Sequence, residues 1–340
     1  MTGTTSRIPA FLLAASLALL AVGCGTVSAG HAGSATSDAP ALAKVGNLEK
    51  TTLNVAVVPA MDSAGFFVAL HEGLFAREGL TIHYSPATSS ETVIKDQVGG
   101  QYDITGGNYV SYIQAQVGGT ANLQIVAEGS VMQQGTQVIL TLARSHIRTL
   151  TQLKGHMLGV NAPNNINYLL DASVLTENGI SPRSVEFPAK PIPFPLMGAA
   201  LQSGVVAAAT VPEPFASLME EKFGAVTLAD LNQGATQQFP IQGYVTTKAW
   251  ARAHPNTVKA FVAALEAGQE IADTSRAAVE AAFESLASPQ TGKVTPLIAS
   301  MVALNIYPLA IDRTRLQRVA NVMLQFGLLR HSFNVDSMIR

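Results

Sequence analysis

The side chains with the clearest chemical potential stand in five short loops, each directly after a predicted strand. Their amide, hydroxyl, carboxyl and backbone N–H groups suit directional hydrogen bonds to a small solute. In open α/β sheets, ligands bind outside the carboxyl ends of the strands, where such loops meet. The predicted ligand-binding residues are Asp62, Ser63, Gly107, Asn108, Tyr109, Ser130, Asn164, Asn165, Asn167 and Glu213.

Several of these residues have an alternative, purely structural interpretation. Asn164 or Asn165 would make a good helix N-cap, and Gly107 could belong to a tight turn. Tyr109 could be a packed helix residue. Glu213 could cap the helix that we expect to start at Pro214. The sequence leaves these alternatives open beside the ligand-binding hypothesis.

The charges in the five loops bear on the class of solute. The loops contain Asp62, Glu128 and Glu213 but no lysine or arginine. A strongly anionic ligand would depend on helix N-termini alone, without the usual bidentate guanidinium. A neutral or cationic polar molecule, such as a nitrogen heterocycle, fits better. Lys190 is the nearest cation that we expect beside the cleft.

The sequence argues against catalysis, a metal centre and nucleic acid. A Gly-x-Ser-x-Gly motif is absent, and no Ser/His/Asp set is indicated by spacing. The seven histidines do not stand at metal-ligand spacings. A net charge of −2 without basic runs is atypical of a nucleic-acid-binding chain. We therefore expect no enzyme, no cofactor and no metal.

Two successive sets of strands and helices must position the loops. Because strands and helices alternate in the first set, a mainly parallel sheet covered on both faces is expected. Its predicted elements are strands at 53–58, 81–85, 102–105 and 123–127 and helices at 65–76, 90–98 and 108–117. The second set has predicted strands at 137–143, 157–160, 185–187, 205–211 and 225–228 and helices at 165–178, 195–202 and 214–222. Beyond a strand at 243–246 the chain is predicted to be helical at 255–273, 276–286, 296–304 and 313–326.

This order predicts two α/β lobes that enclose a cleft, with helices at the C-terminal end. Lobe 1 is predicted to comprise residues 49–140 and 243–340, and lobe 2 residues 141–242. The strands near 138–141 and 242–245 would serve as hinges, so that the lobes rotate as rigid bodies.

The N-terminal segment has the composition of an export signal. Arg7 precedes an apolar run over residues 8–22, which is short for a membrane-spanning helix. Residues 20–24 (LAVGC) resemble the bacterial lipobox, although Ala21 stands where its consensus prefers leucine. The resemblance implies a signal peptide over 1–23 and a lipid on Cys24, the only cysteine. Core packing of Cys24, or ordinary secretion with cleavage near residues 28–30, is the alternative. Residues 24–48, rich in small residues, are expected to form a flexible tether.

Four passages resemble the type II solute-binding proteins of ABC importers, in the branch that binds nitrate, aliphatic sulfonates, taurine and thiamine-pyrimidine precursors. Two depart from the family pattern, since Gln152 and Ala207 stand where it has aspartate, which weakens the subfamily placement. The passages are 66–80 (FFVALHEGLFAREGL), 97–106 (QVGGQYDITG), 150–155 (LTQLKG) and 199–214 (AALQSGVVAAATVPEP).

The resemblance implies a two-lobed periplasmic-binding-protein type II fold, each lobe a mainly parallel sheet flanked by helices. It implies a monomeric extracytoplasmic protein that closes on a small polar organic solute and delivers it to an ABC permease and its ATPase. A pyrimidine-synthase-like enzyme of the same fold is one alternative, but by analogy it needs a cysteine-rich motif, and Cys24 is the only cysteine. A ligand-sensing lipoprotein without transport is the other.

Overall fold

The computed structural model describes residues 46–286 and 293–339. The predicted signal peptide (1–23), Cys24 and the tether as far as residue 45 lie outside the described residues. No helix of the described ranges is long and apolar enough to cross a membrane.

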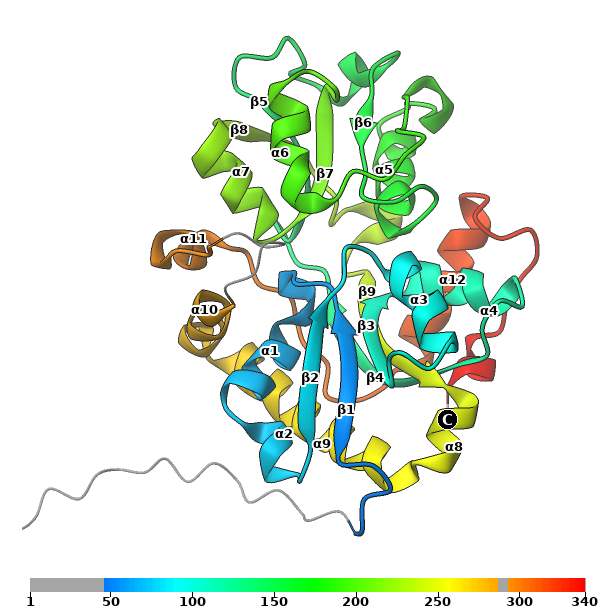
Figure 1. Cartoon of the computed structure of the whole chain (residues 1–340). Helices are drawn as coiled ribbons and strands as arrows, with labels where there is room; N and C mark the ends of the chain where they lie inside the picture. Colours follow the sequence, from blue (N-terminus) through cyan, green and yellow to red (C-terminus); the bar gives the residue numbers. More distant parts are fainter. Residues whose placement is uncertain (1–45, 287–292, 340) are drawn as a thin grey trace, which may run out of the picture. The chain divides into compact units, whose positions relative to one another are not determined.

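The first lobe is built on a five-stranded sheet with the order β2-β1-β3-β9-β4 (Figure 1). Strand β9 is antiparallel to both of its neighbours, whereas β1 is parallel to β2 and β3. Strands β2, β1, β3 and β4 therefore all run in one direction, and β9 alone runs against them. The strands are β1 (Thr52–Val57), β2 (Thr81–Pro86), β3 (Ile104–Asn108), β4 (Leu123–Val131) and β9 (Pro240–Thr247).

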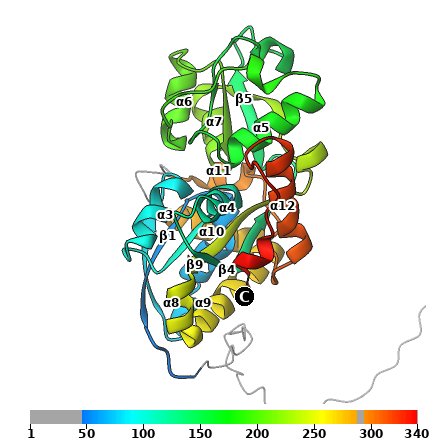
Figure 2. The same ribbon diagram turned by 90° about the vertical axis from the view of Figure 1, so that its right-hand side faces the viewer.

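Helices cover both faces of this sheet (Figures 1 and 2). One face packs against α1 (Ala64–His71), α2 (Leu74–Arg77), α9 (Pro255–Thr274) and α10 (Arg276–Ser285) through a core that includes Val55, Phe66 and Phe261. The other face carries α3 (Ser90–Val98), α4 (Tyr109–Val117) and α12 (Arg313–Gln325). Helix α8 (Lys248–Ala253) follows β9 directly.

The second lobe is built on a four-stranded sheet with the order β6-β7-β5-β8. Strand β5 is antiparallel to β7 and β8, and β6 is parallel to β7. The strands are β5 (Gln137–Leu142), β6 (Leu158–Gly159), β7 (Ala208–Pro212) and β8 (Ala225–Asp230). Helix α5 (Ile166–Glu177) covers one face, and α6 (Phe194–Gln202) with α7 (Phe215–Phe223) covers the other. Each sheet is thus mainly parallel with one reversed strand, as the predicted fold class requires.

The chain passes from the first sheet to the second between Val131 and Gln137 and returns between Asp230 and Pro240. A third segment meets both lobes after α11 (Pro296–Met301), because the Ala303 N–H donates to Glu213 Oε1 at 3.4 Å and Ile306 pairs with Val131. The predicted hinge segments 138–141 and 242–245 lie inside β5 and β9, just beyond these connections. The predicted lobe boundaries also fall within these two strands.

Two predicted elements differ from the observed ones. The helix expected over 65–76 is divided into α1 and α2 at Gly73, which has a φ of 67°. Glycine adopts this left-handed conformation without the steric cost that other residues meet. The strand expected over 185–187 is a single bridge between Glu186 and Met157. Three residues at a sheet edge make too few ladder contacts for a longer strand.

Candidate ligand-binding cleft

A small cavity lies where the carboxyl ends of β1, β3 and β7 meet the starts of β5 and β9. The two lobes come together here in Figure 1, where the arrowhead of β1 points toward the second lobe. The first lobe contributes Val58, Asp62, Ser90, Gly107, Asn108, Ile241 and Gln242 to the wall, and the second contributes Gln137, Asn161, Ile166, Asn167, Phe194 and Pro212. A solute in this cavity would be held from both sides.

Asn108 and Ser90 form a rigid part of the first wall. Asn108 caps α4, because its Oδ1 accepts from the Ser111 N–H at 2.9 Å. The backbone N–H and the Nδ2 of Asn108 both donate to Ser90 Oγ, at 2.8 and 2.9 Å. A Cβ at Gly107 would lie 2.3 Å from the same oxygen, so only glycine permits this close approach.

Asp62 is the carboxylate of the cavity and lies in the single turn η1 (Met61–Ser63) after β1. It is 7 % exposed, and burial raises its pKa from the ordinary 3.8 to about 7. Two amides oppose that rise, because Gln137 Nε2 donates to Oδ2 at 3.1 Å and Asn305 Nδ2 donates to Oδ1 at 2.9 Å. The Gln137 bond joins the two lobes.

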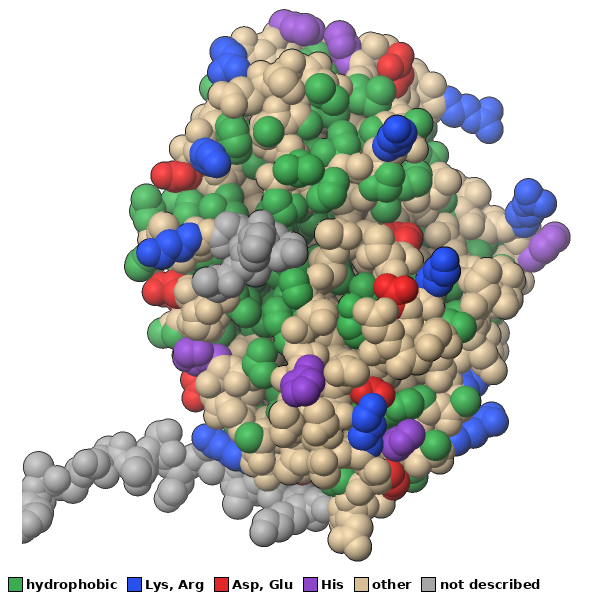
Figure 3. All heavy atoms as spheres, viewed as in Figure 1, with side chains coloured by type: hydrophobic (Ala, Val, Ile, Leu, Met, Phe, Trp, Pro, Cys, Tyr) green, Lys and Arg blue, Asp and Glu red, His purple; other side chains and the backbone are tan. Residues whose placement is uncertain are grey.

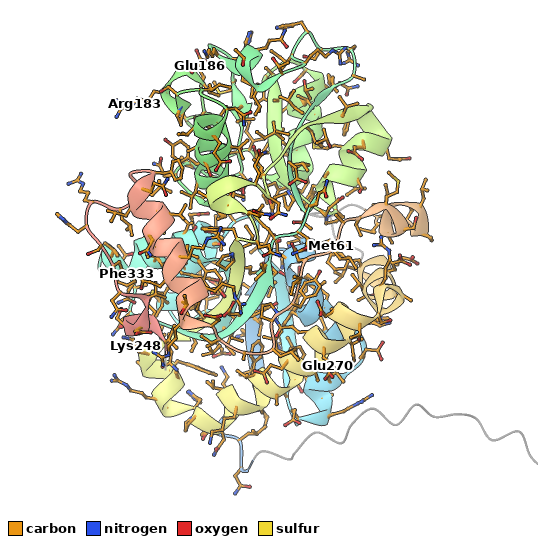
Figure 4. The ribbon with its side chains drawn as sticks, turned by 180° about the vertical axis from the view of Figure 1, so that it is seen from behind. Met61, Arg183, Glu186, Lys248, Glu270 and Phe333 are labelled. Carbon is orange, nitrogen blue, oxygen red and sulfur yellow. The ribbon has the colours of Figure 1, made fainter. Side chains whose placement is uncertain are left out.

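The turn that contains Asp62 is itself held from the second lobe. Figure 4 shows the neighbouring residue, Met61, where the lobes meet. The Met61 N–H donates to the Glu213 carbonyl at 2.8 Å, and the Tyr307 hydroxyl donates to the Met61 carbonyl at 2.9 Å. These bonds position Asp62 relative to both lobes.

The asparagine-rich segment before α5 forms the second wall. Asn165 caps α5, since its Oδ1 accepts from the Asn167 N–H at 3.0 Å, and its Nδ2 donates to Asn161 Oδ1 at 2.7 Å. Asn167 Nδ2 donates to the Thr210 carbonyl at 3.2 Å. The capping role belongs to Asn165, while Asn161 and Asn167 line the cavity.

Four of the ten predicted ligand-binding residues line the cavity: Asp62, Gly107, Asn108 and Asn167. Their contact with a solute stays a prediction. The other six support the wall or lie behind it. Ser63 Oγ hydrogen-bonds to the Val58 carbonyl and to Gln242, and Asn165 is the α5 cap. Tyr109 and Ser130 are buried in the first lobe. Glu213 accepts from the first turn of α7, and the Asn164 carbonyl accepts from Gln114.

Glu213 adopts the structural role that the sequence left open. Its Oε2 accepts from the Ser217 N–H at 3.1 Å and its Oε1 from the Ser217 hydroxyl at 2.9 Å. Burial raises the pKa of Glu213 from 4.5 to about 7. Asn164 links the lobes, since its carbonyl accepts from Gln114 Nε2 of α4 at 2.9 Å.

Sequence reasoning missed five lining residues that carry polar groups or a ring, namely Ser90, Gln137, Asn161, Phe194 and Gln242. Gln137 and Gln242 stand at or near the starts of the reversed strands β5 and β9. A search confined to loops after strands passes over them, because a reversed strand brings its amino end to the carboxyl ends of its neighbours. The available signal was a strand-like run with glutamine at or near its start, directly after a connection between the lobes.

The cavity wall carries no lysine, arginine or histidine among the described residues. Lys190 is exposed and does not line it. Glu128, the third carboxylate of the predicted loops, is paired with Arg315 of α12, whose Nε lies 2.8 Å from Oε2. On the face shown in Figure 3, lysine and arginine side chains stand singly rather than in a patch. Asp62 therefore faces the cavity without a cationic protein partner in its wall.

Solved structures share this architecture at low sequence identity. The alkanesulfonate-binding protein of Xanthomonas axonopodis pv. citri, bound to MOPS, has a TM-score of 0.72 and 17 % identity over 86 % of this chain and 99 % of its own. The nitrate-binding protein of Synechocystis PCC 6803 has a TM-score of 0.71 and 15 % identity over 86 % and 87 %. A desulfurization enzyme has a TM-score of 0.63 and 16 % identity over 85 % and 96 %. These likenesses show the fold, which is that of periplasmic binding proteins.

The sequence comparisons point to one family. No curated protein matches the chain. Residues 46–287, which include every strand of the two sheets, match the NMT1-like family. A match over more than half of the chain shows membership, so this protein belongs to the NMT1-like family.

Proposed function

We propose that this protein is the extracytoplasmic solute-binding component of an ABC importer. The observation that carries the proposal is the cavity between the lobes, lined from both sides by amide, hydroxyl and carboxyl groups. A small polar solute bound there would join the lobes, and the closed form would be the form that docks on the permease. Structural neighbours named for sulfonate and nitrate binding support this role.

In this proposal, closure of the two lobes depends on hydrogen bonds between the lobes and on hydrogen bonds from each lobe to the solute. Asp62 to Gln137 and Gln114 to Asn164 already join the lobes in this structure. The connections at 132–136 and 231–239 are short segments between the two sheets, and we propose that the lobes hinge there. A solute that adds hydrogen bonds to Asn108 and Asn167 would favour the closed over the open arrangement.

We propose a binding role rather than catalysis, although one structural neighbour is named as a desulfurization enzyme. Ser90 is the hydroxyl of the cavity wall, and its Oγ accepts two hydrogen bonds from Asn108. No histidine, lysine or cysteine lines the described wall to activate it. If an assay with candidate sulfonates detects a reaction product, this part of the proposal is wrong.

We further propose that Cys24 carries the lipid that holds the protein near its permease, which raises the local concentration of the receptor. Replacement of Cys24 with alanine tests this step. The variant should move from the membrane fraction to the soluble extracytoplasmic fraction. An unchanged membrane fraction would reject the anchor.

The test of the proposed function combines native mass spectrometry with thermal shift. The purified protein is screened against sulfonates, nitrate, pyrimidines and amines. A solute at about 100 times its dissociation constant stabilises the folded state by about 2.7 kcal/mol, which gives a clear rise in melting temperature. Asn167→Ala should reduce the rise, whereas Asn178→Ala, at the far end of α5, should preserve it. If none of the compounds shifts melting, the proposal fails.

A further inference from the structure

Each side-chain amide of the cavity wall already gives one of its two N–H donors to the protein itself. The bonds are Asn108 to Ser90 Oγ at 2.9 Å, Gln242 to Ser63 Oγ at 2.8 Å, Asn167 to the Thr210 carbonyl at 3.2 Å, Gln137 to Asp62 at 3.1 Å and Asn161 to the Thr88 carbonyl at 3.5 Å.

Two acceptor groups of the wall have unused capacity, the Gln137 amide oxygen and the Asp62 carboxyl group. Gln137 is 3 % exposed, and its Oε1 has no hydrogen-bond partner among the described residues. The two Asp62 oxygens offer about four acceptor sites, and within the described parts of the chain only the amides of Gln137 and Asn305 donate to them. Asp62 and Gln137, which both line the cavity, therefore hold acceptor capacity that a solute with N–H donors would fill.

The charge of the wall favours a positive solute. An ionised carboxylate in a buried site is costly unless a cation pairs with it. The described wall supplies no such cation, and the nearby carboxylates Glu128 and Glu213 are engaged by Arg315 and by the start of α7. The missing partner of Asp62 can come from the solute.

We propose, on the basis of the solute-binding role, that the cleft takes a cationic solute of the ammonium or amidinium class. Its N–H groups donate to the Asp62 carboxylate and to Gln137 Oε1. Asn167 and Phe194 contact the rest of the molecule from the second lobe. The site would reject an anion of the same shape, because the anion would lie beside the Asp62 carboxylate with no cationic side chain nearby to offset the repulsion.

Proton linkage provides an independent signature. Burial raises the pKa of Asp62 to about 7, and a bound cation would lower it again. Tyr307 is the titratable group that faces Asp62 from the segment after α11, and burial keeps its pKa above its ordinary range. Binding below about pH 7 therefore releases one proton, and affinity rises by up to about tenfold per pH unit as pH approaches 7.

In the competing arrangement Asp62 stays protonated whether or not a solute is present. With the Gln137 amide turned by half a rotation, the acid would donate to Gln137 Oε1, and the pair would be a neutral structural link between the lobes. This arrangement predicts no preference for cations and no proton release.

Matched probes of equal shape separate the two arrangements. Benzamidine, benzamide and benzoate form one set, and propylammonium, propanamide and propionate form a second. Binding is measured by calorimetry in two buffers of different protonation enthalpy, on the wild type, Asp62→Asn and Glu78→Gln. Glu78 is a buried carboxyl after α2, outside the cavity.

The cation of at least one set should bind more tightly than its neutral and anionic partners and release a proton. Asp62→Asn should weaken that binding roughly tenfold to a hundredfold, the loss of a hydrogen-bonded charge. Glu78→Gln should bind as the wild type does. The unliganded melting temperature of Asp62→Asn shows whether that variant is folded.

Four results overturn the inference. The first is an anion or amide that binds as tightly as its matched cation. The second is cation binding that survives Asp62→Asn. If no cation binds but a sulfonate or pyrimidine binds and Asn167→Ala abolishes its binding, the cationic class fails while the proposed function stands. If no small solute binds at all, both fail.

Discussion

Raising the pH from about 5 to about 8 should destabilise this protein, because two buried carboxyl groups hold their protons in the folded state. Burial raises the pKa of Asp62 from 3.8 to about 7 and that of Glu213 from 4.5 to about 7. Between these values the folded state keeps a proton that the unfolded chain has lost. The stabilisation is complete below the unfolded pKa and is lost as pH rises through the folded pKa.

The magnitude follows from the two differences in pKa. At 1.36 kcal/mol for each tenfold change, the difference between 3.8 and 7 corresponds to about 4 kcal/mol for Asp62, and that between 4.5 and 7 to about 3 kcal/mol for Glu213. At pH values between the unfolded and folded pKa values of both groups, the free energy of unfolding should fall by up to about 2.7 kcal/mol per pH unit. Asp171 and Glu128, whose pKa values burial also raises, add to the same slope.

Urea unfolding followed by circular dichroism measures this slope. Asp62→Asn and Glu213→Gln should each flatten it, because neither amide can lose a proton in this range. Glu72→Gln, at an exposed helix end, is the matched control and should keep the wild-type slope. Stability that rises between about pH 5 and about pH 8, or the same slope in the double variant, would refute the reasoning.

Three further predictions concern the packing that positions the cleft. Arg315→Met leaves Glu128 buried without its partner and should cost about 3 kcal/mol in urea unfolding, and adding Glu128→Gln should recover most of that loss; an equal cost in the double variant would contradict this. Gly243→Ala places a Cβ 2.4 Å from the Tyr109 ring and should lower stability by about 1–3 kcal/mol, and an unchanged melting temperature would show that the ring can move away. Asn165→Ala removes the α5 cap, so we expect a loss of about 1 kcal/mol together with weaker solute binding; loss of neither would mean that the cap does not support the second wall.

Much of the fold could be predicted because local patterns and global packing agree. The β-branched run at β1, the cap and apolar face of α5, and the alternation of strands and helices each indicate the observed element. The carboxyl-end rule likewise led to Asp62, Gly107, Asn108 and Asn167. These features depend on residues close together in the sequence.

The parts that the sequence did not reveal depend on distant residues. Arg315 pairs with Glu128 across 187 positions, which decides that Glu128 is not a cavity residue. Gln137 and Gln242 reach the cavity because β5 and β9 run against their neighbours. Nothing in local periodicity distinguishes a reversed strand from a parallel one, so neither glutamine was expected in the wall.

The central claim, closure of two lobes on a solute, is tested most directly by the distance between them. Spin labels are placed on Cys24→Ser protein through Lys95→Cys on α3 and Thr176→Cys on α5, both at exposed positions of opposite lobes. The distance between the labels is measured by double electron–electron resonance. It is measured without any addition, with the low-molecular-weight fraction of an extract of the cells that produce the protein, and with the solute that binds best in the screen. We predict a long, broad distribution of distances between the two labels without solute, and a short, narrow one when solute binds. In Asn167→Ala the solute should no longer produce this change. One unchanged distance under all these conditions would contradict the account.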